Sequence, residues 1–163
     1  MVRSPLRLPA ASVLAAALVM LAGCAPTIAM EAAPQSNDPA CADVMVRLPD
    51  QVDGEPRRWT DAQATAAWGD PSASILFTCG LEPIGPTTLP CRTVAGVDWV
   101  IDESEAPRYR VTTFGRVPAV ELYLDNERVS SAEVLDRLSA LVSVLPPDGS
   151  RCLERGDAVD AEG

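Results

Sequence analysis

The chain has 163 residues, of which 47% are hydrophobic and 22% are charged, a composition typical of one globular domain and richer in apolar residues than disordered chains. It holds 13 arginines, no lysine, 23 carboxylates and no histidine, for a formal net charge of −10. This charge argues against nucleic-acid binding, since such proteins present a basic surface to phosphates. The lack of histidine excludes Ser–His–acid and Cys–His catalysis and imidazole metal ligands.

The start of the chain has the order of a secretory signal. Arg3 and Arg7 precede an apolar stretch at 10–22, and small residues follow it. As a helix this stretch would be about 20 Å long, shorter than the ~30 Å hydrocarbon core that a permanent span crosses. We therefore expect residues 1–23 to be a signal peptide, with a stable transmembrane anchor as the weaker alternative.

The residues at the end of the apolar stretch, Leu21, Ala22, Gly23 and Cys24, resemble a bacterial lipobox. In a lipobox the cysteine thiol is joined to diacylglycerol and the chain is cut just before the cysteine. Two or more acyl chains give the lasting attachment that one does not. We expect Cys24 to carry lipid, with palmitate among its acyl groups, and to hold the protein on the extracytoplasmic face of the cell membrane. An ordinary secretory site with an unrelated cysteine is the alternative.

Composition divides the remaining chain into three parts. Residues 24–39 are rich in alanine and proline without a sustained period, and we expect them to form a lipidated tether. Residues 40–153 carry the patterns of one globular domain. Residues 154–163 are acidic and small, and we expect them to be a disordered tail.

A short helix is predicted at the start of the domain. Asp38 is placed to cap it, Pro39 lies in its first turn, and apolar residues recur at helical spacing until Pro49 ends it. A polar stretch at 50–61 follows.

The segment at 64–80 is predicted to form two strands. They are joined by a turn at 69–71, which contains glycine and proline. In the second strand, Ile75, Phe77 and Cys79 would point to one face because side chains alternate along a strand.

Three further segments, at 97–102, 108–113 and 119–125, alternate between apolar and polar residues. Each therefore predicts a strand with one apolar and one polar face. The polar faces are acidic, basic and acidic in turn, which favours cross-strand ion pairs such as Arg110 with Glu121.

The best helix pattern follows these strands. Ser130 and Glu133 have the spacing of a capping box. The apolar stripe behind them consists of Val134, Leu135, Leu138, Leu141, Val142 and Leu145. We expect an α+β fold, a two-layer sandwich of a mainly antiparallel sheet covered by this C-terminal amphipathic helix and the short N-terminal helix.

Four cysteines remain once Cys24 is assigned to lipid, namely Cys41, Cys79, Cys91 and Cys152. Their number is even, disulfides persist in exported domains, and their spacing matches no metal site of close cysteine pairs. Two disulfides are therefore expected. Spacing alone leaves open which of the three pairings forms.

Candidate contacts for a ligand or partner are few. Trp99 alternates with apolar neighbours and is expected in the core, whereas Trp59 stands in a polar stretch and Trp68 stands beside a turn. The polar sheet face adds Arg110 and Glu121. The proposed contact residues are therefore Trp59, Trp68, Arg110 and Glu121.

No cofactor is expected. The acidic run that contains Asp102, Glu103 and Glu105 lacks the spacing of an EF-hand loop and is interpreted as solvated charge, so no metal site is predicted. The chain also has no phosphate-cradling glycine loop.

A set of residues along the domain resembles one known family, exported or lipid-anchored actinobacterial proteins catalogued as domain of unknown function 3515. The resemblance implies an envelope location and brings no activity. It also implies the pairing of Cys41 with Cys79 and of Cys91 with Cys152, because some members keep only the cysteines that match the first pair. The residues that carry it are Cys41, Leu48, Pro49, Ala67, Trp68, Gly69, Asp70, Pro71, Cys79, Gly80, Gly96, Val97, Asp98, Trp99, Arg116, Pro118 and Val120.

From the sequence we expect a monomeric, non-enzymatic lipoprotein of the cell envelope. Its partners would be the membrane, through the lipid on Cys24, and an envelope protein or small ligand. The alternative is a hydrolase of cell-wall glycan or peptide that uses two carboxylates at the correct spacing.

Overall fold

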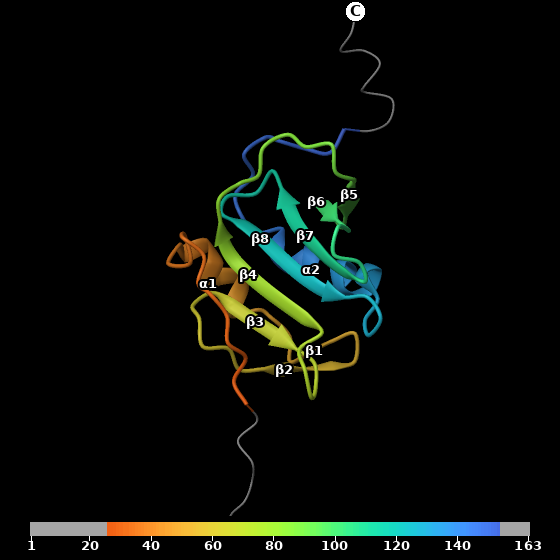
Figure 1. The fold of residues 1–163 in the computed structure, drawn as a ribbon. Coiled ribbons are helices and arrows are strands. Elements are labelled where there is room, and N and C mark those ends of the chain that lie inside the picture. The colour runs from red at the N-terminus through yellow and green to blue at the C-terminus, as the bar shows by residue number, and fades with distance from the viewer. Residues whose placement is uncertain (1–25, 154–163) are drawn as a thin grey trace, which may run out of the picture.

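The computed structural model describes residues 26–153. The strands form an eight-stranded sheet in the order β1-β2-β3-β4-β8-β7-β6-β5, with neighbouring strands antiparallel (Figure 1). This confirms the α+β class and the mainly antiparallel sheet. In chain order the elements are α1 (Pro39–Met45), β1 (Gln51–Val52), β2 (Glu55–Arg58), β3 (Thr65–Trp68), β4 (Ile75–Leu81), β5 (Cys91–Val94), β6 (Val97–Asp102), β7 (Arg108–Phe114), β8 (Ala119–Asp125) and α2 (Ser131–Val142).

The two ends of the sequence lie outside the described residues. The predicted signal peptide, Cys24 and the acidic tail at 154–163 belong to these ends. Between residues 26 and 153, no helix is long and apolar enough to cross a membrane.

The first helix begins where the sequence predicts. The carboxylate of Asp38 accepts a hydrogen bond from the amide of Ala40 at 2.8 Å, and Pro39 occupies the first turn. The helix ends at Met45, and the chain continues in turns to Leu48, whose side chain is buried.

Two hairpins were not predicted. Asp53 and Gly54 join β1 to β2 with φ values of 48° and 79°, and Ala95 and Gly96 join β5 to β6 with φ values of 47° and 77°. Two successive positive φ angles are typical of the type I′ turn, whose twist suits a two-residue hairpin. The polar stretch at 50–61 thus contains a hairpin that its Asp-Gly pair could have indicated.

One face of the sheet, which we call the core face, carries the buried apolar side chains. Ile75, Phe77 and Cys79 point to it, as predicted, and all three are fully buried. The register continues this face from Phe77 to Leu122 of β8 and from Leu122 to Val111 of β7. The alternation in the central strands therefore reports burial on one side of the sheet.

Both helices contact the core face. A disulfide joins Cys41 of α1 to Cys79 of β4. The indole N–H of Trp99 in β6 donates a hydrogen bond to the hydroxyl of Ser139 in α2 at 2.9 Å, and both side chains are fully buried. Figure 1 shows α2 behind β6, β7 and β8.

We predict that replacing Ser139 with valine lowers the free energy of unfolding by about 1–3 kcal/mol. The indole N–H of Trp99 would then be buried without a partner, and this desolvation cost is not recovered. Urea unfolding measures the change. Ser143→Ala, at an exposed position of the same helix end, is the control and should change stability little. Equal stabilities of the two variants would contradict this role of Ser139.

The second helix is capped at two sites. The hydroxyl of Ser130 accepts a hydrogen bond from the amide of Glu133 at 3.4 Å, as the predicted capping box requires. The amide of Ser130 donates to the carboxylate of Asp53 at 2.7 Å. The turn between β1 and β2 thus supplies the acceptor that Glu133 was expected to supply.

The segment before α1 contacts the domain along the part that is described. In space, this segment runs from beside the end of β2 to the start of α1, and it is coloured red to orange in Figure 1. The amide of Gln35 donates to the carbonyl of Gly80 at 2.8 Å, and Ser36 is buried. Gly80 has a φ of 107°, and a Cβ there would lie 2.5 Å from the amide nitrogen of Ser36. Residues predicted as a tether are therefore held against the domain from residue 26 onward.

Candidate functional site

The outer face of the sheet, opposite the core face, is the first candidate surface. The register aligns Val100, Thr112, Glu121 and Thr78 across β6, β7, β8 and β4. Val100 is buried, whereas the other three are half-buried. At these central strands the outer face is therefore partly accessible to solvent.

A charged network occupies one part of the outer face. The guanidinium of Arg110 lies 2.7 Å from the carboxylate of Glu121 and 3.6 Å from that of Glu105. The hydroxyl of Tyr123 donates to Glu105 at 2.7 Å, and the guanidinium carbon of Arg110 lies 5.1 Å from the centroid of the Tyr123 ring. The predicted pair of Arg110 with Glu121 is thus present. Because these charges are partly exposed and paired with one another, the network contributes little to stability.

Arg110 and Tyr123, two groups of this network, have pKa values shifted away from neutral pH. Partial burial opposes the charge of Arg110, but attraction by Glu121 and Glu105 outweighs it and raises the pKa of this arginine. The hydrogen bond to Glu105 raises the pKa of Tyr123. Both shifts lead away from neutral pH, whereas a general acid or base works best with a pKa near it.

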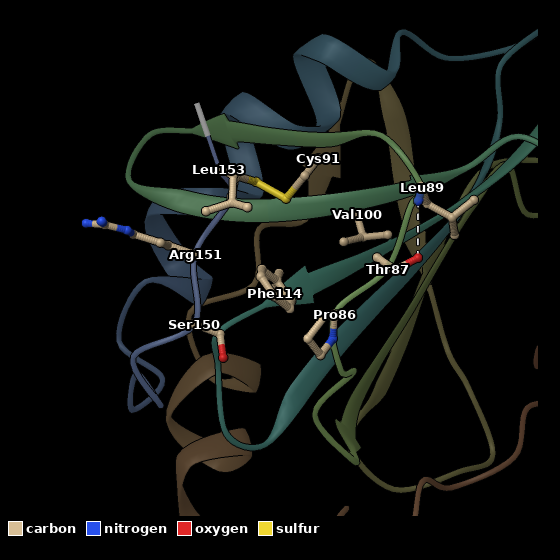
Figure 2. Close-up of a pocket in the computed structure, with 10 residues that line it drawn as sticks. Pro86, Thr87, Leu89, Cys91, Val100, Phe114, Ser150, Arg151 and Leu153 are labelled. Atoms are coloured by element: carbon tan, nitrogen blue, oxygen red, sulfur yellow. Dashed lines mark hydrogen bonds between the residues drawn. A yellow bond between two sulfur atoms is a disulfide. The ribbon is translucent and has the colours of Figure 1, made fainter. Parts of the chain in front are cut away.

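A groove of about 510 Å³ lies at another part of the outer face (Figure 2). We call it the outer groove. It is bounded by the loop between β4 and β5, by strands β5, β6 and β7, and by the C-terminal segment at 150–153. Its lining consists of Pro86, Thr87, Leu89, Cys91, Val100, Phe114, Ser150, Arg151, Cys152 and Leu153.

The C-terminal wall of the outer groove is fixed by covalent and polar contacts. A disulfide joins Cys91 of β5 to Cys152, and the amide of Cys152 donates to the carboxylate of Asp98 at 2.7 Å. Gly115 has a φ of 74°, and a side chain there would collide with the carbonyl of Ser150. The disulfide pairing, including Cys41 with Cys79, is the one that the family resemblance implies.

The groove can hold an apolar group. Its volume falls within the range of small-ligand pockets, roughly 300–1,000 Å³. Arg151 is the charged residue in its lining, and Figure 2 shows this side chain directed away from Phe114 and Val100. Neither Leu89 nor Phe114 was predicted as a site residue. The sequence did contain one indication of this groove, namely Val100, an apolar residue on the polar face of its strand.

The structure corrects one candidate contact. Trp68 is fully buried on the core face, and its indole N–H donates to the carbonyl of Pro49 at 3.0 Å, so the proposed ligand contact at Trp68 is wrong. Trp59 is 81% exposed. It borders a second hollow of about 500 Å³, which is lined by Met45, Asp50, Arg57, Arg58, Trp59, Thr60 and Thr65.

Trp59 is far from the other predicted contacts. It follows β2, whereas Arg110 lies in β7, and β3, β4 and β8 separate these strands in the sheet. The outer groove lies beyond β8 as well, with Val100 in β6. The predicted contact residues therefore belong to separate surfaces.

Asp102, an acidic residue near the network, is hydrogen-bonded within the protein itself. The carboxylate of Asp102 accepts a hydrogen bond from the amide of Ser104 at 2.9 Å, and hydrogen bonds from Ser104 lower the pKa of Asp102. Across residues 26–153, no three or more Cys, Asp or Glu side chains are grouped so as to hold a metal ion.

The family model described as protein of unknown function (DUF3515) matches residues 5–149. Neither a curated protein nor a solved structure matches the chain.

Proposed function

Because the chain belongs to the DUF3515 family, whose description assigns no activity, we propose from its own residues that it is a lipid-anchored, non-enzymatic binding protein of the cell envelope. It would sit on the extracytoplasmic face of the membrane and hold a small ligand or a partner protein in the outer groove.

The use of the cysteines carries this proposal. Cys41 pairs with Cys79 and Cys91 pairs with Cys152, so these bonds account for every cysteine except Cys24. Disulfides of this kind persist in exported proteins. Cys24 stands in the lipobox-like sequence at the end of an apolar stretch, which supports a role in attachment.

The position of the outer groove supports a role in binding. The described chain begins at one end of the molecule and ends at the other (Figure 1). A lipid on Cys24 would hold the first end at the membrane, and the C-terminal segment that lines the groove would point away from it. The groove would then be accessible to an envelope partner.

The hydrolase alternative has less support. A glycosidase needs two carboxyl groups about 5–10 Å apart at the scissile bond. The outer groove has no carboxylate in its lining, and the second hollow has only Asp50. Between residues 26 and 153, these two hollows thus favour binding over carboxylate catalysis.

Site-specific crosslinking in cells tests the binding role. A photoreactive residue at Thr112, on the outer face beside Val100, should give a discrete crosslinked product, and one at Asp136, exposed on α2, should not. Leu89→Glu should remove the product without changing the melting temperature, since Leu89 is a 41% exposed residue of the groove wall. A product that survives Leu89→Glu, or no product from position 112, would contradict binding in the groove.

A further inference from the structure

Hydrogen bonds hold the start of the described chain beside Trp59. A guanidinium nitrogen of Arg58 donates to the carbonyl of Pro26 at 2.9 Å, and the amide of Ile28 donates to the carbonyl of Trp59 at 2.8 Å. The amide of Met30 donates to the carboxylate of Asp61 at 2.8 Å. These contacts run along the end of β2 on both sides of Trp59.

Very little chain separates this point from the proposed lipid. Cys24 precedes Pro26 by two positions, and an extended chain spans at most about 3.3–3.6 Å per residue. A lipid on Cys24 would therefore be joined to Pro26 through at most about 7 Å of chain. Acyl chains on Cys24 would enter the bilayer next to the end of β2.

The surface at this point combines exposed apolar side chains with charged groups, since Asp50 and Arg57 line the hollow that Trp59 borders. Trp59 and Val46, each 81% exposed, are the most exposed large apolar side chains of the described chain. Val46 directly follows Met45, which lines the same hollow as Trp59. Tryptophan is enriched where a membrane meets water, because its ring is apolar and its N–H is polar.

We propose that the surface around Trp59 lies against the phospholipid bilayer, so that the anchored domain has a fixed membrane-facing end. The proposal rests on the proposed lipid on Cys24 and adds an orientation to it. Because the connection is short, the lipid keeps Trp59 close to the bilayer surface. The effective concentration of Trp59 at that surface is therefore high, and a contact that would be weak alone becomes persistent. The outer groove, which is lined by residues 150–153, then lies toward the end of the domain away from the bilayer.

Fluorescence quenching tests this orientation. The lipidated mature chain is reconstituted into phosphatidylcholine vesicles with or without bromine on the acyl chains. Trp68 and Trp99 are fully buried in the core, so the emission of Trp59 is obtained as the difference between the unaltered chain and Trp59→Phe. We expect brominated lipid to remove the Trp59 emission and to leave that of Trp59→Phe unchanged. Equal quenching of both chains would overturn the proposal.

A linker variant provides the matched control. A flexible glycine–serine insertion between Ala25 and Pro26 keeps the lipid but releases the domain from its short connection. We expect this variant to float with the vesicles and to lose most of the quenching of Trp59. If the chain without the insertion floats but its Trp59 is not quenched, the orientation alone is overturned. A chain that does not float with vesicles overturns the lipid anchor and the orientation with it.

Discussion

Replacing Cys24 with alanine is expected to abolish the incorporation of labelled palmitate into the protein. The sulfur atom of Cys24 is the one that would carry diacylglycerol. Without acyl chains, the lasting attachment to the membrane is lost. Metabolic labelling followed by purification measures this change, and the protein should leave the lipid-anchored membrane fraction.

Cys41→Ala serves as the matched control for this experiment. It also removes one cysteine, but that cysteine lies in a disulfide of the folded domain. We expect it to retain the label. Label that persists in Cys24→Ala would refute attachment at Cys24, and the label per molecule of purified protein should be the same in Cys41→Ala as in the unaltered chain.

Replacing both Cys41 and Cys79 with alanine is expected to lower the free energy of unfolding by at least about 4 kcal/mol. The disulfide closes a loop with a sequence separation of 38 residues, for which the chain-entropy model gives about this value. Both cysteines are fully buried in the core, so the loss of packing adds to the entropic effect. Denaturant unfolding of the purified domain measures the change.

The second disulfide is the comparison for this prediction. Cys91 and Cys152 close a longer loop, with a separation of 61 residues, but both are only partly buried and lie at the edge of the sheet. If position in the core matters, the alanine pair at 41 and 79 should be the less stable of the two variants. The reverse order would show that loop length alone governs their effect.

Much of the fold was predictable because local patterns report burial. The strands at 97–102 and 119–125 alternate in sequence because one of their faces meets the core, and the segment at 131–142 carries the matching helical stripe. The edge strands β1 and β5 have few buried residues. Their sequences therefore show no alternation of apolar and polar residues, and only the turn residues indicate these strands.

Burial on both faces hid the environment of Trp68. All four residues of β3 are buried, so the strand has no period of two. Arg58 lies opposite Ala67 on the outer face and bonds to the N-terminal segment that passes there. The N-terminal segment that covers the outer face removes the alternation of β3, so the sequence does not show that Trp68 points to the core face. Its position beside a turn was therefore interpreted as a possible surface.

The outer groove was unpredictable for a related reason. Its walls come from the loop at 82–90, from three strands and from the segment at 150–153. The disulfide between Cys91 and Cys152 brings the last of these to the sheet. Spacing alone did not determine that pairing, so the site could not be assembled from the sequence.

Mass spectrometry of the protein purified from membranes tests the lipid anchor most directly. We expect the mature chain to begin at Cys24 and its N-terminal peptide to carry the added mass of diacylglycerol and palmitate. A mature chain that begins at another residue, or one that begins at Cys24 without added lipid mass, would contradict this expectation.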